Sequence, residues 1–397
     1  MSGTRRKPGL LGVHVEGYRA WLGRRGYTPP TVRNMLKELG QVGRWLSAEG
    51  LEPAHLSEER LSEFLAARRR AGHRKVPGLR GMRPMLAYLR EIGAVAVPVA
   101  VSTPLEVLLG QYRTWLVEER GLAEATVQRY EKTARRFLQQ AASAGTEPAS
   151  LTGADVNAFL LLECARVSAG SAKGRVAELR SVLRFLFLRH VTPLRLGTAV
   201  PPVGGWRLAT VPPTMTATDI QALLDHCDRG SEVGARDFAI LTLIARLGLR
   251  SIEVARLELG DVDWRAGELL VRGKARRQGR LPLPTDVGEA MVAYLSPRER
   301  VEGDRHLFLT CRAPRGPIRA DLVGDVVERA CRRAGLPTVG PHRLRHALAA
   351  ELLRRGASLV AIGQVLRHQD LATTALYAKV DLGALRTVAQ PWPGEIQ

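Results

Sequence analysis

The segment Pro341–His346, PHRLRH, gathers basic and imidazole side chains in a stretch whose apolar spacing predicts a helix. On a helix His342 and Arg345 are three positions apart and therefore share one face. A guanidinium fork beside an imidazole suits an anionic oxygen such as that of a phosphate. His342 and His346 also form an H-x-x-x-H pair, but Arg343 stands where the zinc protease motif carries Glu, so we predict no metal site.

A second charged segment precedes it in the same half of the chain. Arg250 and Glu253 follow an apolar stretch, Asp237–Leu247, that we predict to be a buried helix. An unpaired buried guanidinium is costly, so Arg250 requires a partner. Glu253, one helical turn later, is placed to orient it.

A basic turn and a tyrosine complete the set. Lys274 lies in a turn between two predicted strands, 267–272 and 279–284, and His368 precedes Tyr377 near the end of the chain. Each feature alone is a weak signal, because a basic turn is ordinarily a solvated phosphate contact and a helical Tyr is ordinarily part of the packing.

In order and spacing these residues resemble the active-site set of the tyrosine recombinases, the family of phage integrases and Xer-type proteins. The six matching positions are Arg250, Lys274, His342, Arg345, His368 and Tyr377. The resemblance is strong over residues 215–389. Two neighbouring positions depart from the family, since Arg367 and Ala275 stand where it usually has Gly.

The resemblance implies a site-specific recombinase that cuts and rejoins duplex DNA, for the integration, excision or transposition of a mobile element. Tyr377 would attack a backbone phosphate and form a 3′-phosphotyrosyl bond. Arg250 and Arg345 would clamp the phosphate oxygens, with a hydrogen bond from His368. Lys274 would protonate the leaving oxygen.

His342 is the expected acid–base partner of the reaction, and Glu253 would orient Arg250. Because the covalent intermediate conserves the energy of the phosphodiester, the resemblance implies no ATP, metal or other cofactor. It also implies a homotetramer on paired DNA sites, and it leaves open whether an accessory protein or a sister recombinase takes part.

Composition agrees with a nucleic-acid partner. The chain has 59 Lys and Arg against 39 Asp and Glu, a net charge of +20 in 397 residues. Such an excess on a chain of globular composition predicts a polyanionic partner. The candidate DNA contacts are basic residues in short clusters: Arg135, Arg136, Lys173, Arg276, Arg277 and Arg343.

The compartment follows from what the sequence lacks. Its four cysteines are too few and too scattered for a disulfide framework or a zinc knuckle. Its longest apolar run, near residues 92–101, is far below the roughly 20 residues that a membrane span needs. No signal peptide is recognisable at the start. We therefore expect a cytoplasmic protein with no membrane partner.

An internal repeat organises the first half. Aromatic, Gly and Thr positions recur in one order, and each copy closes on a basic amphipathic segment. The matched positions are Tyr18 and Tyr112, Trp21 and Trp115, Thr31 and Thr126, Phe64 and Phe159, and the triplets 44–46 and 136–138. The second copy resembles the family's SAM-like core-binding domain.

The expected fold class is mainly α, with a small antiparallel β-sheet in the catalytic domain. We predict two all-α helical bundles, over 8–95 and 104–190. A Pro- and Gly-rich linker follows over 191–213, and the catalytic domain occupies 214–390.

Three alternatives stay open at this point. A type IB topoisomerase uses related chemistry and would relax plasmids without site preference. A DNA-binding protein on a recombinase scaffold would lack catalysis, although this chain keeps all six residue types. A metal nuclease would use carboxylates such as Glu253, Asp261 and Asp263, but Asp in that context is typical of a turn.

Overall fold

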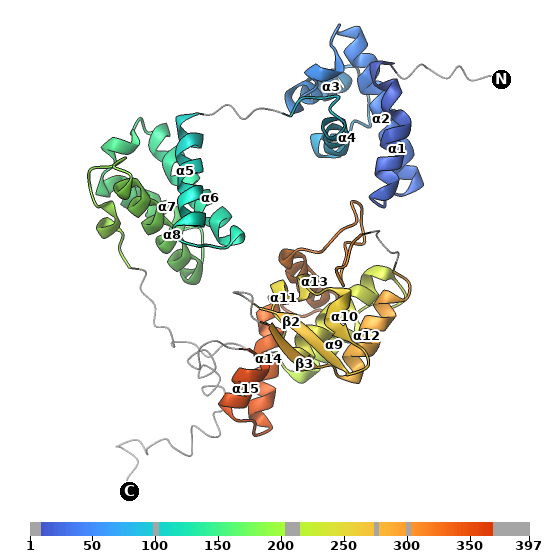
Figure 1. Ribbon diagram of the computed structural model, residues 1–397, viewed down its shortest axis with the longest axis vertical. Helices are drawn as coiled ribbons and strands as arrows, with labels where there is room; N and C mark the ends of the chain where they lie inside the picture. The colour runs from blue at the N-terminus through green and yellow to red at the C-terminus, as the bar shows by residue number, and fades with distance from the viewer. Residues whose placement is uncertain (1–8, 98–102, 203–214, 274–277, 299–302, 368–397) are drawn as a thin grey trace, which may run out of the picture. The chain divides into compact units, whose positions relative to one another are not determined.

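The computed structural model in Figure 1 describes residues 9–97, 103–202, 215–273, 278–298 and 303–367. The chain forms two compact units, one of residues 98–209 and one of residues 1–97 together with 210–397. Within the latter unit, residues 11–95 and residues 215–347 have separate hydrophobic cores. No helix in these described stretches is long and apolar enough to cross a membrane.

The first repeat, residues 9–97, is entirely helical. Its core is built around stacked aromatic rings, with Tyr18 and Tyr88 centred 5.1 Å apart and Trp21 packed against both. Its elements are η1 (Gly9–His14), α1 (Val15–Arg24), α2 (Pro29–Ala48), η2 (Pro53–His55), α3 (Glu58–Arg70) and α4 (Leu79–Glu91).

The second repeat, residues 103–202, has the same helical order. Tyr112, Trp115 and Phe185 form the matching aromatic cluster. Thr152 caps α7, and Asp155 completes the capping box. The elements are α5 (Pro104–Glu118), α6 (Glu124–Ser143), η3 (Pro148–Ser150), α7 (Gly153–Cys164), α8 (Ala169–Leu188) and η4 (Leu196–Ala199).

The two repeats match in register as well as in order. The bounds of α2 and α6, and of η2 and η3, differ by 95 residues at both ends, as do the starts of α3 and α7. Buried positions agree, with Val32, Leu39 and Leu46 matched by Val127, Ala134 and Ala141. This register pairs 41–43 with 136–138. The predicted match of 44–46 to 136–138 was therefore wrong by three residues, because local composition does not define helix phase.

The predicted linker is partly a piece of the second repeat. Leu196 and Val200 are buried in its core, and the guanidinium of Arg180 donates to the Val200 carbonyl at 2.8 Å. Residues 191–202 therefore pack on the helices despite their Pro and Gly content. Residues 203–214 lie outside the described part of the chain.

The C-terminal half, residues 215–367, surrounds α10, which packs against α9, α12, α13 and α14. A sheet of order β1-β2-β3 is antiparallel throughout. The elements are α9 (Ala217–Asp225), α10 (Glu232–Leu247), α11 (Ser251–Ala255), η5 (Leu259–Asp261), β1 (Val262–Asp263), β2 (Glu268–Arg272), β3 (Gln278–Pro282), α12 (Thr285–Leu295), α13 (Ala320–Arg333), α14 (Pro341–Arg354) and α15 (Leu359–Val365).

The expected fold class, mainly α with a small antiparallel sheet, is confirmed. One boundary differs. The buried helix begins at Glu232 instead of Asp237, because Ser231 caps it by accepting from the Gly234 N–H. Outside the sheet, His306 and Leu309 make isolated β-bridges.

Gly248 turns the chain at the end of α10. Its φ is +60°, in the left-handed region that favours glycine. A Cβ there would lie 2.6 Å from Cδ2 of Leu366 and 3.1 Å from Cδ2 of Leu348. The sharp turn brings Arg250, two residues later, out of the core.

We expect Gly248→Ala to lower the free energy of unfolding by about 2 kcal/mol, from backbone strain and the forced shift of Leu366. The measurement is urea denaturation followed by circular dichroism. Gly335→Ala is the control, because its φ is +68° and a Cβ there meets nothing within 4 Å. That variant should lose only about 1 kcal/mol. Equal losses would contradict the close packing at Gly248.

Candidate active site

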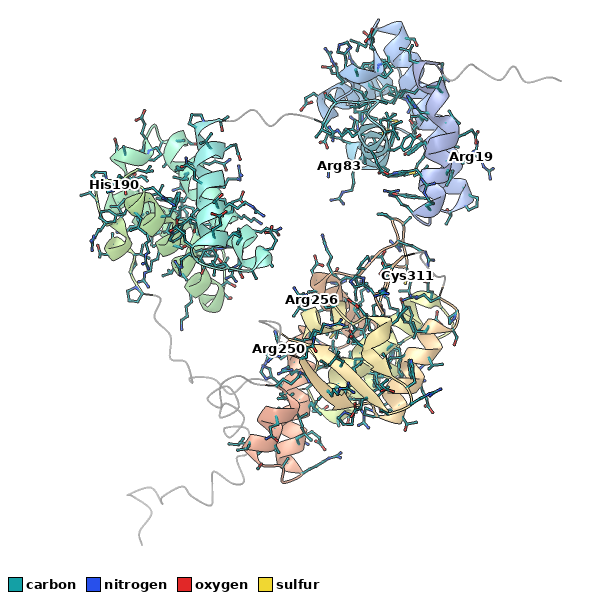
Figure 2. All side chains as sticks on the ribbon, in the orientation of Figure 1. Arg19, Arg83, His190, Arg250, Arg256 and Cys311 are labelled. Atoms are coloured by element: carbon teal, nitrogen blue, oxygen red, sulfur yellow. The ribbon has the colours of Figure 1, made fainter. Side chains whose placement is uncertain are left out.

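Arg250, labelled in Figure 2, lies in the chain between α10 and α11 and is the N-cap of α11. The sequence predicted it directly after the buried helix. In the structure its backbone is extended, and the next helix begins after it. Its backbone N–H donates to Oε2 of Glu253 at 2.9 Å, and its Nη1 donates to Oε1 at 2.6 Å. Glu253 therefore caps the helix and holds the guanidinium with the same carboxylate.

The Glu253 carboxylate is buried, with 2% of the residue exposed. Burial raises its pKa, but the Arg367 guanidinium and the contacts with Arg250 outweigh burial and hold the pKa below its ordinary value. The carboxylate thus stays ionised at neutral pH and balances part of the positive charge around it.

Arg345 extends from α14 into the protein and is only 3% exposed. Its Nη1 donates to the carbonyl of Gly248, and its Nη2 donates to the carbonyl of Leu366. Nη2 of Arg250 donates to the carbonyl of Arg367 at 3.2 Å. Two guanidiniums from segments far apart in sequence therefore meet at consecutive carbonyls, at the end of α15.

His342 stands at the start of α14, one turn before Arg345, and is exposed. The surrounding protein nevertheless desolvates the ring enough to lower its pKa, and the positive charges of Arg345 and Arg250 lower it further. The ring is therefore neutral near pH 7 and has a nitrogen free of a proton. The pKa of His346 is also lowered, first by burial and then by His342.

Three of the six predicted catalytic residues, Lys274, His368 and Tyr377, lie outside the described residues, as do Arg276 and Arg277. Gly273, before Lys274, and Arg367, before His368, are described. The β2–β3 hairpin that carries Lys274 resumes at Gln278, and a Cβ on Gly279 would lie 3.6 Å from Cδ of Arg367. The turn end of the β2–β3 ladder therefore lies beside Arg367, the residue that precedes His368.

The other candidate DNA contacts are divided between two parts of the chain. Arg343 is on α14, half-buried, beside the site formed by Arg250 and Arg345, which we call the arginine site. Arg135 pairs with Glu106 and Glu131, and Arg136 pairs with Glu163 at 2.7 Å, all in the second repeat. Lys173 is exposed on α8.

An ion-pair network around a buried carboxylate in the second repeat was not predicted from the sequence. The carboxylate of Glu178, on α8 and 2% exposed, accepts from Thr133 at 2.6 Å and from Arg175 at 2.8 Å, and it pairs with Arg129 at 2.7 Å. The only feature of the sequence that indicates this network is an acidic residue, Glu178, between apolar residues on an amphipathic helix. The network fixes arginines on the face where α6 and α8 meet.

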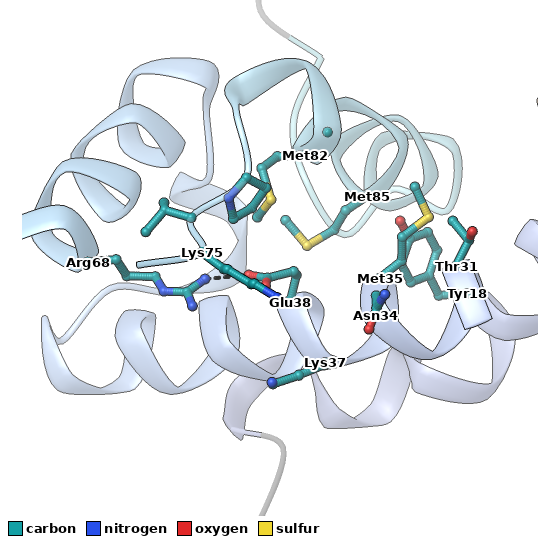
Figure 3. Close-up of a pocket in the computed structure, with 13 residues that line it drawn as sticks. Tyr18, Thr31, Asn34, Met35, Lys37, Glu38, Arg68, Lys75, Met82 and Met85 are labelled. Carbon is teal, nitrogen blue, oxygen red and sulfur yellow. Dashed lines mark hydrogen bonds and ion pairs between the residues drawn. The ribbon is translucent and has the colours of Figure 1, made fainter. Parts of the chain in front are cut away.

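The first repeat has a cavity of about 450 Å³ (Figure 3). The last helices of the two repeats, α4 and α8, can be aligned by their buried residues, which differ by 97 in number, as Tyr88 and Phe185 do. In this alignment the residue of the first repeat that corresponds to Glu178 is Gly81. Methionines line the space, and Arg68 pairs with Glu38 at 2.6 Å on its wall. The repeats thus share a fold but differ in polar content at this place.

Comparison with known proteins places the chain in a family. Residues 213–382 match the phage integrase family, and residues 109–190 match the phage integrase N-terminal SAM-like domain. The y4rA protein of Sinorhizobium fredii, which carries the name of an integrase/recombinase, is 38% identical over 401 residues, covering 99% of this chain and 97% of its own. Tyrosine recombinase XerD of Mycobacterium tuberculosis is 31% identical over 310 residues, covering 73% and 97%.

Solved structures share the fold. The XerH site-specific recombinase, in a post-cleavage complex with a palindromic difH substrate, aligns over 97% of this chain and 95% of its own with a TM-score of 0.55 and 17% identity. A lambda integrase (75–356) dimer bound to a COC′ core site aligns over 68% and 96%, with a TM-score of 0.52 and 17% identity.

The family matches, together with the shared fold, therefore define a DNA strand-exchange enzyme of the tyrosine recombinase class. The chain belongs to the phage integrase family, and it is a site-specific recombinase that acts on DNA. The topoisomerase, the catalytically silent protein and the metal nuclease are not favoured by these findings.

We expect the ring of His342 to titrate with a midpoint below 6.5, its ordinary value, in NMR spectra of histidine-labelled protein. In the acid–base role that the family resemblance implies for His342, protonation below that midpoint removes the proton acceptor, so the rate of covalent attachment to DNA should fall as the pH drops. Arg250→Gln should raise the midpoint, because it removes one of the cations that lower it. A midpoint of 6.5 or higher in the unaltered chain would contradict the electrostatic description of the site.

Proposed function

We propose that this recombinase works through Tyr377 and the five residues that resemble the rest of the family's set. The tyrosine oxygen attacks a DNA phosphorus, the bond from phosphorus to the 5′-oxygen breaks, and a 3′-phosphotyrosine and a free 5′-hydroxyl result. The reverse step, with the 5′-hydroxyl of another strand, reseals the DNA. One phosphodiester is exchanged for another, so the steps balance without ATP.

The observation that carries the proposal is the meeting of Arg250 and Arg345 at the end of α15, directly before His368. The transition state places extra negative charge on the non-bridging phosphate oxygens. Guanidiniums already held by hydrogen bonds stabilise that charge without reorganising. His368 adds a hydrogen bond to the same oxygens in this proposal, and Lys274 protonates the leaving 5′-oxygen.

His342 is assigned the proton transfer at Tyr377. A tyrosine hydroxyl has an ordinary pKa of about 10 and is a poor nucleophile at neutral pH. The lowered pKa of His342 keeps the ring unprotonated, which is the form that accepts a proton. Glu253 keeps Arg250 in position by holding both its backbone and its guanidinium.

The substrate in this proposal is duplex DNA that carries paired recombination sites, bound by a homotetramer, with the reaction serving to integrate, excise or transpose a mobile element. Relatives named as an integrase/recombinase and as XerD support this range of reactions. The second repeat is the principal DNA-binding module, and the first repeat, which has the same fold, extends the contact. We place the protein in the cytoplasm, with its DNA.

Replacing the nucleophile tests the reaction. Tyr377→Phe removes one hydroxyl, so we expect covalent DNA capture to be abolished while the DNA dissociation constant changes by less than about 2-fold. The assay uses duplexes from the DNA flanking the gene, after the wild-type cut positions have been mapped, and detects protein–DNA adducts on denaturing gels. Adduct formation by the Phe variant would exclude Tyr377 as the nucleophile. Plasmid relaxation by the wild type without site preference would favour a topoisomerase.

Replacing one arginine of the second repeat tests the DNA-binding surface. We expect Arg136→Gln to weaken binding to all sequences alike and to reduce the slope of log affinity against log salt concentration by about 1, because one phosphate contact is lost. Gln139→Ala, an exposed change on the same helix, serves as the control. An unchanged salt slope would exclude Arg136 from the interface.

A further inference from the structure

Arg367 has a backbone conformation that side chains rarely adopt. Its φ is +53°, and among the described residues only His190 shares a positive φ without being glycine. The family usually has Gly at this position, which adopts such a φ without strain. An arginine here incurs a cost of about 1 kcal/mol, so its side chain must make contacts that offset the strain.

Two hydrogen bonds join Arg367 to the Arg250–Glu253 pair. Its Nη2 donates to Oε2 of Glu253 at 2.8 Å, and only 17% of the side chain is exposed. Its carbonyl accepts from Arg250, as described above. Nη1 donates to the carbonyl of Val365 at 3.1 Å. Arg367 therefore touches both members of the Arg250–Glu253 pair, one through its side chain and the other through its backbone.

The carboxylate of Glu253 is consequently divided between two guanidiniums. Oε1 accepts from Nη1 of Arg250, while Oε2 accepts from the Arg250 backbone and from Arg367. With Oε2 occupied, the carboxylate cannot bind Arg250 in the two-pronged manner that is otherwise the strongest arrangement. The Arg250 side chain is 32% exposed, so its remaining N–H groups are accessible to a phosphate.

We propose that Arg367 is a positioning residue, which occupies one oxygen of Glu253 so that Arg250 keeps N–H groups directed at the scissile phosphate. This inference rests on the proposed function, since it takes Arg250 as a phosphate ligand. Arg367 also raises the positive charge of the site by one, next to a carboxylate that a single arginine would already neutralise.

The test begins with Arg367→Gly, which fits the left-handed backbone and restores the usual residue of the family. The reaction is a single turnover of the full-length protein, at saturating concentration, on a nicked duplex carrying the mapped cut site. We expect covalent capture to slow by roughly 10-fold to 100-fold, the range typical of residues that orient an active-site group. The dissociation constant for DNA should change by less than about 2-fold. Arg319→Gln, which removes an exposed arginine paired with Asp321, should react at the wild-type rate.

Two further measurements separate positioning from a general effect on folding. Arg367→Lys should be intermediate in rate, because ammonium provides the charge without the planar fork. Added methylguanidinium should restore part of the rate of Arg367→Gly and none of the rate of a Tyr377→Phe protein. Thermal denaturation monitors folding in each variant.

A double-mutant cycle with Glu253→Gln tests whether Arg367 acts on Arg250 through Glu253. If Arg367 acts through Glu253, adding Arg367→Gly to Glu253→Gln should slow capture by less than about 2-fold further, because coupled losses do not add. The proposal would be overturned if the rate losses of the two single variants multiplied in the double variant, or if Arg367→Gly reacted at the wild-type rate. A wild-type protein that never forms an adduct would instead overturn the proposed function itself, and the inference with it.

Discussion

The buried guanidinium of Arg345 is the interaction on which the rest of the site depends. It donates to the carbonyls of Gly248 and Leu366, the residues that directly follow α10 and α15. Carbonyls at a helix C-terminus have no partner within the helix, and that end carries partial negative charge. Arg345 donates hydrogen bonds to those carbonyls, and these hydrogen bonds fix the position of its guanidinium. One side chain thus joins three segments, and its orientation is set before any DNA arrives.

Charge balance is the second constraint. A buried carboxylate is stable only when it is ionised beside cations or neutral through protonation. Glu253 is ionised beside Arg250 and Arg367, which lower its pKa. It holds the side chains of Arg250 and Arg367 while capping α11. Because one carboxylate faces more than one arginine, the site retains net positive charge, which suits a phosphate whose negative charge grows in the transition state.

The duplicated helical half shows how one fold accommodates different surfaces. Register is kept because the same buried positions must meet across the bundle in both copies. Polar content is less constrained, so the second repeat buries Glu178 among arginines where the first has Gly81 and a cavity. Arginines held by ion pairs lose less freedom on binding a phosphate than unpaired ones, which supports the proposal that the second repeat is the principal DNA-binding module.

Local patterns in the sequence determined the fold class, the helices, the hairpin and the types of the residues proposed for catalysis. Helical spacing, capping residues such as Thr152, and alternating apolar positions act over a few residues and are readable directly. Only the tertiary structure decided which groups meet. The partners of Arg345 lie about a hundred residues away in one case, and the contact of Arg367 with Glu253 joins a turn to a different helix. Such contacts depend on how the helices pack, which no local spacing records. The sequence therefore showed only that Arg367 replaces the usual Gly, and the contacts behind its proposed role came from the structure.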